Sequence, residues 1–257
     1  MIAQFQEYLD LSQTLIWHGF FVFLRIGAAV SLLPAFGEMS VPVRIKLGVA
    51  IAFTFIVAPS VTLTGVEGLD RIGLVSTILV ETLIGLVLGL GVRMFVFILQ
   101  TAGAIAAQST SLSQLLGNSG AEPLPAIGHV LVVAGFALAV TTGLHIRVAT
   151  YFASSYKIFA FGVLPATEIA LFWGLSQVSQ AFGMAFRLAA PFVIMSALYN
   201  LTLGVINRAM PQLMVAFVGA PVITTGGLVL LALMSPILLS VWVNALHSFL
   251  TDAGVAP

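Results

Sequence analysis

The sequence contains no cysteine, so it offers neither a disulfide bond nor a thiolate metal site. Charged residues are scarce as well, at 7% of the 257 residues, and the formal net charge is zero. A chain without a basic excess does not suggest binding to nucleic acid or to anionic lipid. These absences argue against a disulfide-rich secreted protein and against a nucleic-acid-binding protein.

Catalytic and cofactor-binding patterns are also missing. The four histidines are scattered and lack the spacing of metal ligands; they are His18, His129, His145 and His247. None lies beside an obvious nucleophile and acid, and no glycine-rich phosphate loop occurs. We therefore expect no catalytic residues, no cofactor and no metal, and we do not expect an enzyme.

Apolar side chains are abundant. Hydrophobic residues make up 60% of the chain, and the mean hydropathy is +1.15. Repeated apolar stretches of about twenty residues or more are typical of helices that cross a membrane. The composition predicts an all-α, polytopic, membrane-associated protein with broken helices and hairpins.

Prolines, glycines and polar residues divide the apolar sequence into runs. The runs cover roughly residues 15–33, 43–58, 72–107, 126–144, 169–205 with a break at Pro191, and 213–250, which reads as two helices. The run 72–107 exceeds the roughly 20 residues that cross a bilayer, so it must bend, tilt or leave the membrane. If each run crosses the membrane once, Arg44 and Arg147 lie on opposite sides of it, which disagrees with the positive-inside rule. Either the helix count is wrong or some helices do not cross.

Five charges lie inside apolar runs: Arg25, Glu81, Arg93, Arg187 and Arg208. Such charges are costly in hydrocarbon and mark an interior pathway or a protein contact. Over residues 78–99, the apolar side chains contribute roughly −4.5 to −9 kcal/mol to insertion, and Glu81 with Arg93 costs roughly +5 to +7 kcal/mol. Because these terms nearly cancel, we expect the buried charges to contact neighbouring subunits.

Small residues recur at steps of four. Gly85 and Gly89 lie between Glu81 and Arg93 on one helical stripe, which lets another backbone approach closely. The two charges cannot pair with each other, because twelve residues of helix separate them by roughly 18 Å. Similar stripes contain Gly135 with Gly143, and Gly204 with Arg208. We expect these glycines to be helix-packing surfaces; the alternative is chance spacing in a glycine-rich chain.

The most polar stretch follows the third run and is rich in Ser, Gly and Pro, so it reads as a loop. Its candidate functional residues are Gln108, Ser109, Thr110, Ser111, Leu112, Ser113, Gln114, Leu115, Leu116, Gly117 and Asn118. On composition alone, an ordinary solvent-exposed connector remains an equal alternative to a functional loop.

Several motifs resemble those of the FliR family of flagellar export proteins. Arg25 is followed by Pro34-Ala-Phe-Gly37 and then by Val41-Pro-Val-Arg44, and a segment starting at Arg208 is similar to the family's signature before the final helices. The signature residues are Pro34, Pro42, Arg44, Pro211, Gln212, Phe217 and Pro221. The motifs occur in family order over about residues 25–240.

The resemblance implies a structural and gating subunit of the flagellar type III export gate, built into a larger helical assembly. Its partners would be FliP-like and FliQ-like subunits, an FlhB-like subunit, membrane lipid and unfolded export substrates. Residues 1–257 would form one membrane domain, with a FliP-like part to about residue 170 and a FliQ-like hairpin over about 171–257. The implied location is the bacterial inner membrane, in the flagellar basal body. Residues 108–118 would project into the channel and help to keep it closed.

Other functions stay open. A virulence injectisome relative shares the same core motifs. A small-solute transporter would also contain broken helices and charges, but that class often shows internal repeats, and none is found here. An intramembrane enzyme would need catalytic groups that the sequence lacks.

Overall fold

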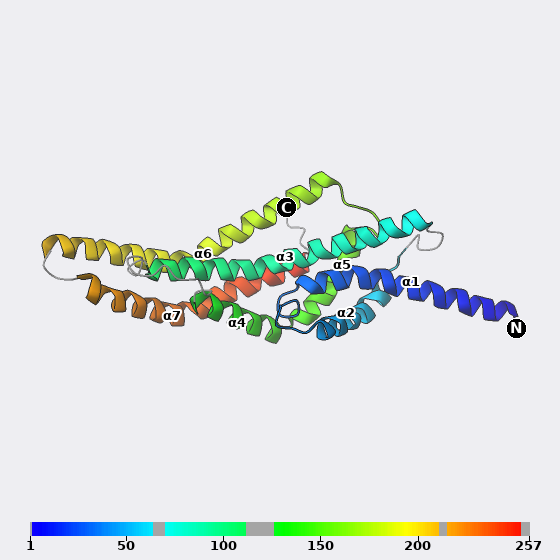
Figure 1. The fold of residues 1–257 in the computed structure, drawn as a ribbon, viewed down its shortest axis with the longest axis horizontal. Helices are drawn as coiled ribbons and strands as arrows, with labels where there is room; N and C mark the ends of the chain where they lie inside the picture. The colour runs from blue at the N-terminus through cyan, green and yellow to red at the C-terminus, as the bar shows by residue number, and fades with distance from the viewer. Residues whose placement is uncertain (1, 64–69, 112–125, 211–214, 253–257) are drawn as a thin grey trace. The chain divides into compact units, whose positions relative to one another are not determined.

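The structure, a computed structural model, describes residues 2–63, 70–111, 126–210 and 215–252. Every regular element in these ranges is a helix (Figure 1). The elements are α1 (Ile2–Leu32), α2 (Val43–Val57), the short 3₁₀ helix η1 (Ala58–Ser60), α3 (Arg71–Ser111), α4 (Ala126–Thr141), α5 (Leu144–Ile158), α6 (Thr167–Ala209) and α7 (Val215–Thr251). The predicted all-α class is confirmed.

Several helices are long and apolar enough to cross a membrane. Five meet this criterion within the described ranges, and the bent pair α4–α5 would raise the number to six. The three longest, α3, α6 and α7, have 41, 43 and 37 residues. At about 1.5 Å per residue, each is much longer than a hydrocarbon core of about 30 Å. The expectation that the run 72–107 exceeds the length of a simple membrane span is confirmed for α3. Helices α6 and α7 exceed that length as well.

The chain divides into two compact units that interleave in sequence. The first unit contains Met1–Arg93, Thr142–Leu175 and Leu246–Pro257, and the second contains Met94–Thr141 and Ser176–Ala245. This is not the expected division near residue 170. The expected division rests on a resemblance of the two parts to FliP-like and FliQ-like proteins and not on compactness, so it stays a prediction.

In the first unit, α1 packs on α2, and α2 packs on α5. Aromatic side chains form part of this core: the Phe53 and Phe152 rings meet edge to face with centroids 5.8 Å apart. Helix α3 approaches α1 at its glycines, since a Cβ on Gly89 would lie 2.6 Å from the Ala29 carbonyl oxygen. A Cβ on Gly85 would likewise overlap the Arg25 carbonyl. The absence of both side chains allows the two helices to make backbone contact.

The second unit uses the same means of close packing. A Cβ on Gly103 of α3 would overlap Gly128 of α4, so these two helices also meet backbone to backbone. Gly135 faces Leu99 and Trp242, and its added Cβ would lie 2.6 Å from a Leu99 methyl. Trp242 is fully buried, and its indole N–H donates to the Phe95 carbonyl at 2.8 Å. The aromatic ring therefore joins α7 to α3 with its polar group satisfied.

Three expectations about helix ends were wrong. Helix α6 continues through Pro191, because one missing N–H removes only one bond from a helix of 43 residues. The final run is one helix, although it contains Pro221 and Pro236. Gln108–Ser111 belong to the last turn of α3 and not to a loop.

Gly143 has a role other than helix packing. It lies at the bend between α4 and α5 with φ of +86°, and a Cβ there would meet nothing within 4 Å. A positive φ is easily adopted only by glycine. Nothing in the chain packs against this position, so the expectation of a packing surface at Gly143 stays a prediction. Spacing along a helix could not show that the helix ends here.

Candidate functional site

The most distinctive polar site is a buried ion pair in the first unit. Arg25 on α1 and Glu81 on α3 have side chains with 0% exposure. The Arg25 Nε donates to one Glu81 carboxylate oxygen at 2.7 Å, and Nη2 donates to the other at 2.9 Å. This two-point contact uses the planar guanidinium and fixes the relative position of the two helices.

The rest of the guanidinium is bound by α5 and by the segment after it. Arg25 Nη1 donates to the Phe159 carbonyl at 3.1 Å and to the Ser155 hydroxyl at 3.4 Å. The Tyr156 ring lies under the guanidinium carbon, 3.7 Å from centroid to Cζ. We call Arg25, Glu81, Ser155, Tyr156 and Gly162 the charge cluster.

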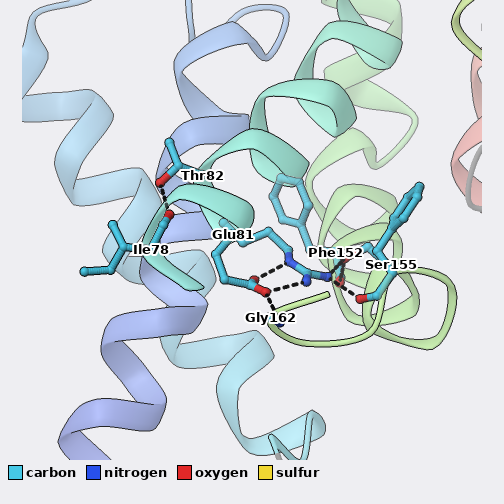
Figure 2. Close-up of polar contacts among 8 residues, drawn as sticks. Ile78, Glu81, Thr82, Phe152, Ser155 and Gly162 are labelled. Carbon is cyan, nitrogen blue, oxygen red and sulfur yellow. Dashed lines mark hydrogen bonds and ion pairs between the residues drawn. The ribbon is translucent and has the colours of Figure 1, made fainter. Parts of the chain in front are cut away.

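Gly162 completes the charge cluster from the loop after α5. Its backbone N–H donates to the Glu81 carboxylate at 3.0 Å, and its φ is +68° (Figure 2). Figure 2 shows Glu81 between its own helix and this loop, with Ser155 on the neighbouring helix. Glu81 therefore accepts from a side chain and from a backbone group. The loop conformation that allows this suits glycine.

The charge cluster has the chemistry of a structural connection. Its two formal charges neutralise each other, and the Arg25 guanidinium and the Glu81 carboxylate are both hydrogen-bonded, whereas the buried Tyr156 hydroxyl has no hydrogen-bond partner. A buried pair of this kind contributes little net stability, but removing one partner leaves an uncompensated charge and is strongly destabilising. The cluster thus fixes the arrangement of α1, α3 and α5 in the first unit.

This geometry changes the expectation for Arg25 and Glu81. Both charges lie entirely inside the chain and bind each other, so they present no surface to a neighbouring subunit. The sequence argument correctly held that Glu81 and Arg93 do not pair with each other. It placed the partner of Glu81 in another protein, because nothing in a linear sequence indicates that Arg25 lies beside it.

Arg93 has a different environment, at the C-terminal end of α1. Its guanidinium lies 3.6 Å from the Glu38 carboxylate and donates to the Leu32 carbonyl at 3.4 Å. Lys46 donates to the nearby Gly37 carbonyl at 2.9 Å. Arg93 thus binds a carbonyl at the C-terminal end of α1, where the helix dipole also favours positive charge, and Lys46 binds a carbonyl of the turn that follows.

Of the five charges that lie inside apolar runs, Arg187 and Arg208 are exposed. Both lie on α6 in the second unit. Arg187 donates to the Gly183 carbonyl of its own helix at 3.2 Å. Gly204, on the Arg208 stripe, is exposed, and a Cβ there would meet nothing within 4 Å. This face of α6 is open in the single chain. Whether a partner covers it stays a prediction.

Only some of the expected gate residues and signature residues lie within the described ranges. Leu112–Asn118 lie outside the described residues, as do Pro211 and Gln212. Pro34 is buried beside the end of α1, whereas Pro42, Arg44 and Pro221 are exposed. Phe217 belongs to α7.

The histidines lie apart from the charge cluster. His18 contacts the Ala58 carbonyl at 2.9 Å, and His247 contacts the Thr142 hydroxyl at 3.2 Å. Within the described residues, no group of three or more His, Cys, Asp or Glu side chains has the arrangement of a metal site.

Sequence reasoning missed three of the five members of the charge cluster. Ser155, Tyr156 and Gly162 come from a segment that showed only mixed composition, and a backbone N–H is a ligand that no side-chain pattern reveals. The Gly103–Gly128 contact was also missed, because each helix there contributes a single glycine and no stripe.

Comparison with known proteins gives matches over nearly the whole chain. Residues 16–249 match the family described as bacterial export proteins, family 1. A protein of Caulobacter vibrioides named flagellar biosynthetic protein FliR is 34% identical over 232 residues, which cover 89% of this chain and 92% of the relative. The Escherichia coli protein of that name is 28% identical over 221 residues, covering 85% and 84%. The Bacillus subtilis protein is 26% identical over 248 residues, covering 91% and 95%.

Proposed function

Because the chain belongs to family 1 of the bacterial export proteins, the family of the FliR proteins, we propose that it is a subunit of the flagellar type III export gate. The single observation that carries this proposal is the match over residues 16–249. The relatives named above all have flagellar names, which favours a flagellar role over an injectisome role. The proposed role is structural, without catalysis.

The outer face of α6 supports a role in an assembly. We define this face by its exposed apolar residues in the second unit: Val178, Phe182, Phe186, Ile194, Leu198, Leu201 and Val205. Only 17% of the apolar window of this helix is buried in the chain itself. The face runs from Val178 to Val205, which at about 1.5 Å per residue spans about 40 Å, so a hydrocarbon core of about 30 Å does not cover all of it when the helix stands upright. Protein partners would cover the remainder.

The proposed partners are the FliP-like, FliQ-like and FlhB-like subunits of the gate, together with unfolded export substrates. The proposed location is the bacterial inner membrane, in the flagellar basal body. Apolar helices and the family match support a membrane protein of the export apparatus, and the choice of membrane belongs to the proposal. The segment 112–118 is proposed to help close the channel, on the resemblance and its polar composition.

Co-purification tests the assembly. A tagged chain should bring down the FliP-like and FliQ-like subunits from membranes in a stable complex. Arg208→Ala should lower the yield of this complex, because it removes an exposed charge from the open face of α6. Lys157→Ala, an exposed cation on α5 in the other unit, serves as control and should leave the yield unchanged. A tagged chain that purifies alone under these conditions would contradict the assembly role.

A further inference from the structure

A cavity of about 650 Å³ lies between α1 and α2 in the first unit, within the size range of sites that bind small molecules. The two helices pack against each other as a hairpin, with His18 of α1 beside Ala58 just after α2 (Figure 1). The lining residues lie within 14–23 on α1 and within 51–61 on α2 and the segment after it. We call this cavity the hairpin groove.

The hairpin groove begins at one end of two candidate membrane spans. These spans cover Ser12–Leu32 and Val43–Ser60, so Thr14 lies near the start of the first and Pro59 near the end of the second. From Thr14 to Phe23, at about 1.5 Å per residue, the wall on α1 is about 14 Å long. Half of a hydrocarbon core of about 30 Å is about 15 Å. The groove therefore has the depth of one leaflet, measured inward from the membrane boundary.

The lining of the hairpin groove suits hydrocarbon. Among the described residues, none of the lining side chains is charged. His18 contacts the Ala58 carbonyl at 2.9 Å, and the Thr54 hydroxyl donates to the Ala50 carbonyl at 2.7 Å. Thr14 also has an interaction within the chain. Because these polar side chains are already engaged, the groove offers a ligand mainly apolar contact and shape.

The surroundings of the hairpin groove favour lipid as the occupant. Leu15 and Phe55 line the groove and are 62% and 77% exposed, which is unfavourable in water and not in hydrocarbon. The two spans have 21 and 18 residues, so they are about 32 and 27 Å long and match a core of about 30 Å. Unlike the outer face of α6, their outer faces can be covered by lipid from end to end.

Gly19 keeps the hairpin groove open. It lines the groove on α1, and a Cβ there would meet nothing within 4 Å. A glycine inside a helix is less favourable than alanine, and here no close contact between helices requires it, in contrast to Gly85 and Gly89. The space that a side chain would take at this position belongs to the groove.

We propose that the hairpin groove binds one acyl chain of a membrane phospholipid. The headgroup lies at the membrane boundary near Thr14 and Pro59, and the acyl chain runs inward to Phe23. Selection is by shape and apolar contact, because no charged lining side chain is placed to bind a headgroup. This site goes beyond the proposed function and does not depend on it, since it needs only the two membrane helices of the first unit.

The test uses the complete chain with the subunits that co-purify with it, in phosphatidylcholine vesicles. A trace of the phosphatidylcholine has a diazirine in the middle of one acyl chain, and illumination attaches it to neighbouring residues that mass spectrometry then locates. Thr54 lines the groove and is only 9% exposed, so label there reports an acyl chain inside it. Ile16 is exposed and does not line the groove, so it reports lipid on the open face. We expect label at both residues.

Gly19→Leu should remove most of the label at Thr54 and leave the label at Ile16 unchanged, because the leucine side chain occupies the groove. Gly19→Ala should cause a smaller loss, and it tests the groove if the larger side chain prevents folding. Gly48→Leu is the matched control, since Gly48 is exposed on α2, does not line the groove, and has nothing within 4 Å of an added Cβ. Both labels should be unchanged in this control.

Four results would overturn the proposal. The first is label at Ile16 without label at Thr54 in the wild type, and the second is equal label at Thr54 in all the glycine variants and the wild type. The third is label at Thr54 only after the partner subunits are removed, which would show that protein covers the groove. The fourth is label at Thr54 from a phosphatidylglycerol probe but not from phosphatidylcholine, since selection by headgroup contradicts a site that binds the acyl chain alone.

Discussion

The guanidinium of Arg25 binds groups that are far away in the sequence. Glu81 is 56 positions away, and Ser155 and the Phe159 carbonyl are 130 and 134 positions away. The guanidinium is suited to this task because it holds several donors in one plane. A lysine at this position would lack the planar fork, so it could not reproduce the two-point contact with Glu81.

Removing one charge of the pair should destabilise the protein strongly. Glu81→Leu leaves Arg25 buried without its counter-charge, and we expect a loss of about 3–5 kcal/mol. The double variant Arg25→Met with Glu81→Leu should recover much of this loss, because no uncompensated charge remains. Thermal unfolding of the detergent-purified protein measures both. Glu168→Gln, at an exposed position on α6, is the control. Equal losses in the single and double variants would show that the charge itself is not the cause.

Among the helices, the contact between α1 and α3 depends on the absence of side chains. Gly89→Ala should lower the melting temperature, because its Cβ would lie 2.6 Å from the Ala29 carbonyl oxygen and would force the helices apart. Gly48→Ala is the matched control: Gly48 lies inside α2, is exposed, and has nothing within 4 Å of the added methyl. Alanine there should stabilise by about 0.4–1 kcal/mol. We expect the melting temperature to fall for Gly89→Ala and to rise for Gly48→Ala. A change in the same direction for both variants would contradict the packing argument.

Much of the helical architecture could be predicted from the sequence. Apolar runs and their breaks gave the approximate positions of α2, α3, α4 and α6, since hydrophobicity acts locally, but they did not predict α5, whose composition is mixed. They failed at Pro191, which α6 passes through, because a proline inside a long helix removes one backbone hydrogen bond without having to end the helix. For the charge cluster, the sequence identified Arg25 and Glu81 as unusual but could not pair them, because a pair across 56 residues has no local signal. The Gly162 backbone donor had no signal at all.

For the molecule as a whole, the open question is how a gate stays closed. Deleting Ser113–Asn118 should leave co-purification with partner subunits unchanged, because α3 ends at Ser111 and its last turn is retained. If the segment closes the channel as proposed, the same deletion should make membranes leaky to small solutes, because its short polar side chains would no longer block the opening. Dye release from proteoliposomes measures this. A deletion of similar length at residues 64–68, which interrupts no described helix, controls for the effect of shortening a connection.

The charge cluster also has a consequence for synthesis. A ribosome adds about 5–20 residues per second, so Arg25 exists for roughly 3–11 s before Glu81 is made, and longer before Ser155 and Phe159. During that interval α1 carries an uncompensated charge that is costly to place in hydrocarbon. We therefore expect insertion of α1 to be less favourable until α3 has been made, and the contacts of Arg25 with Ser155 and Phe159 form only after α5 has followed.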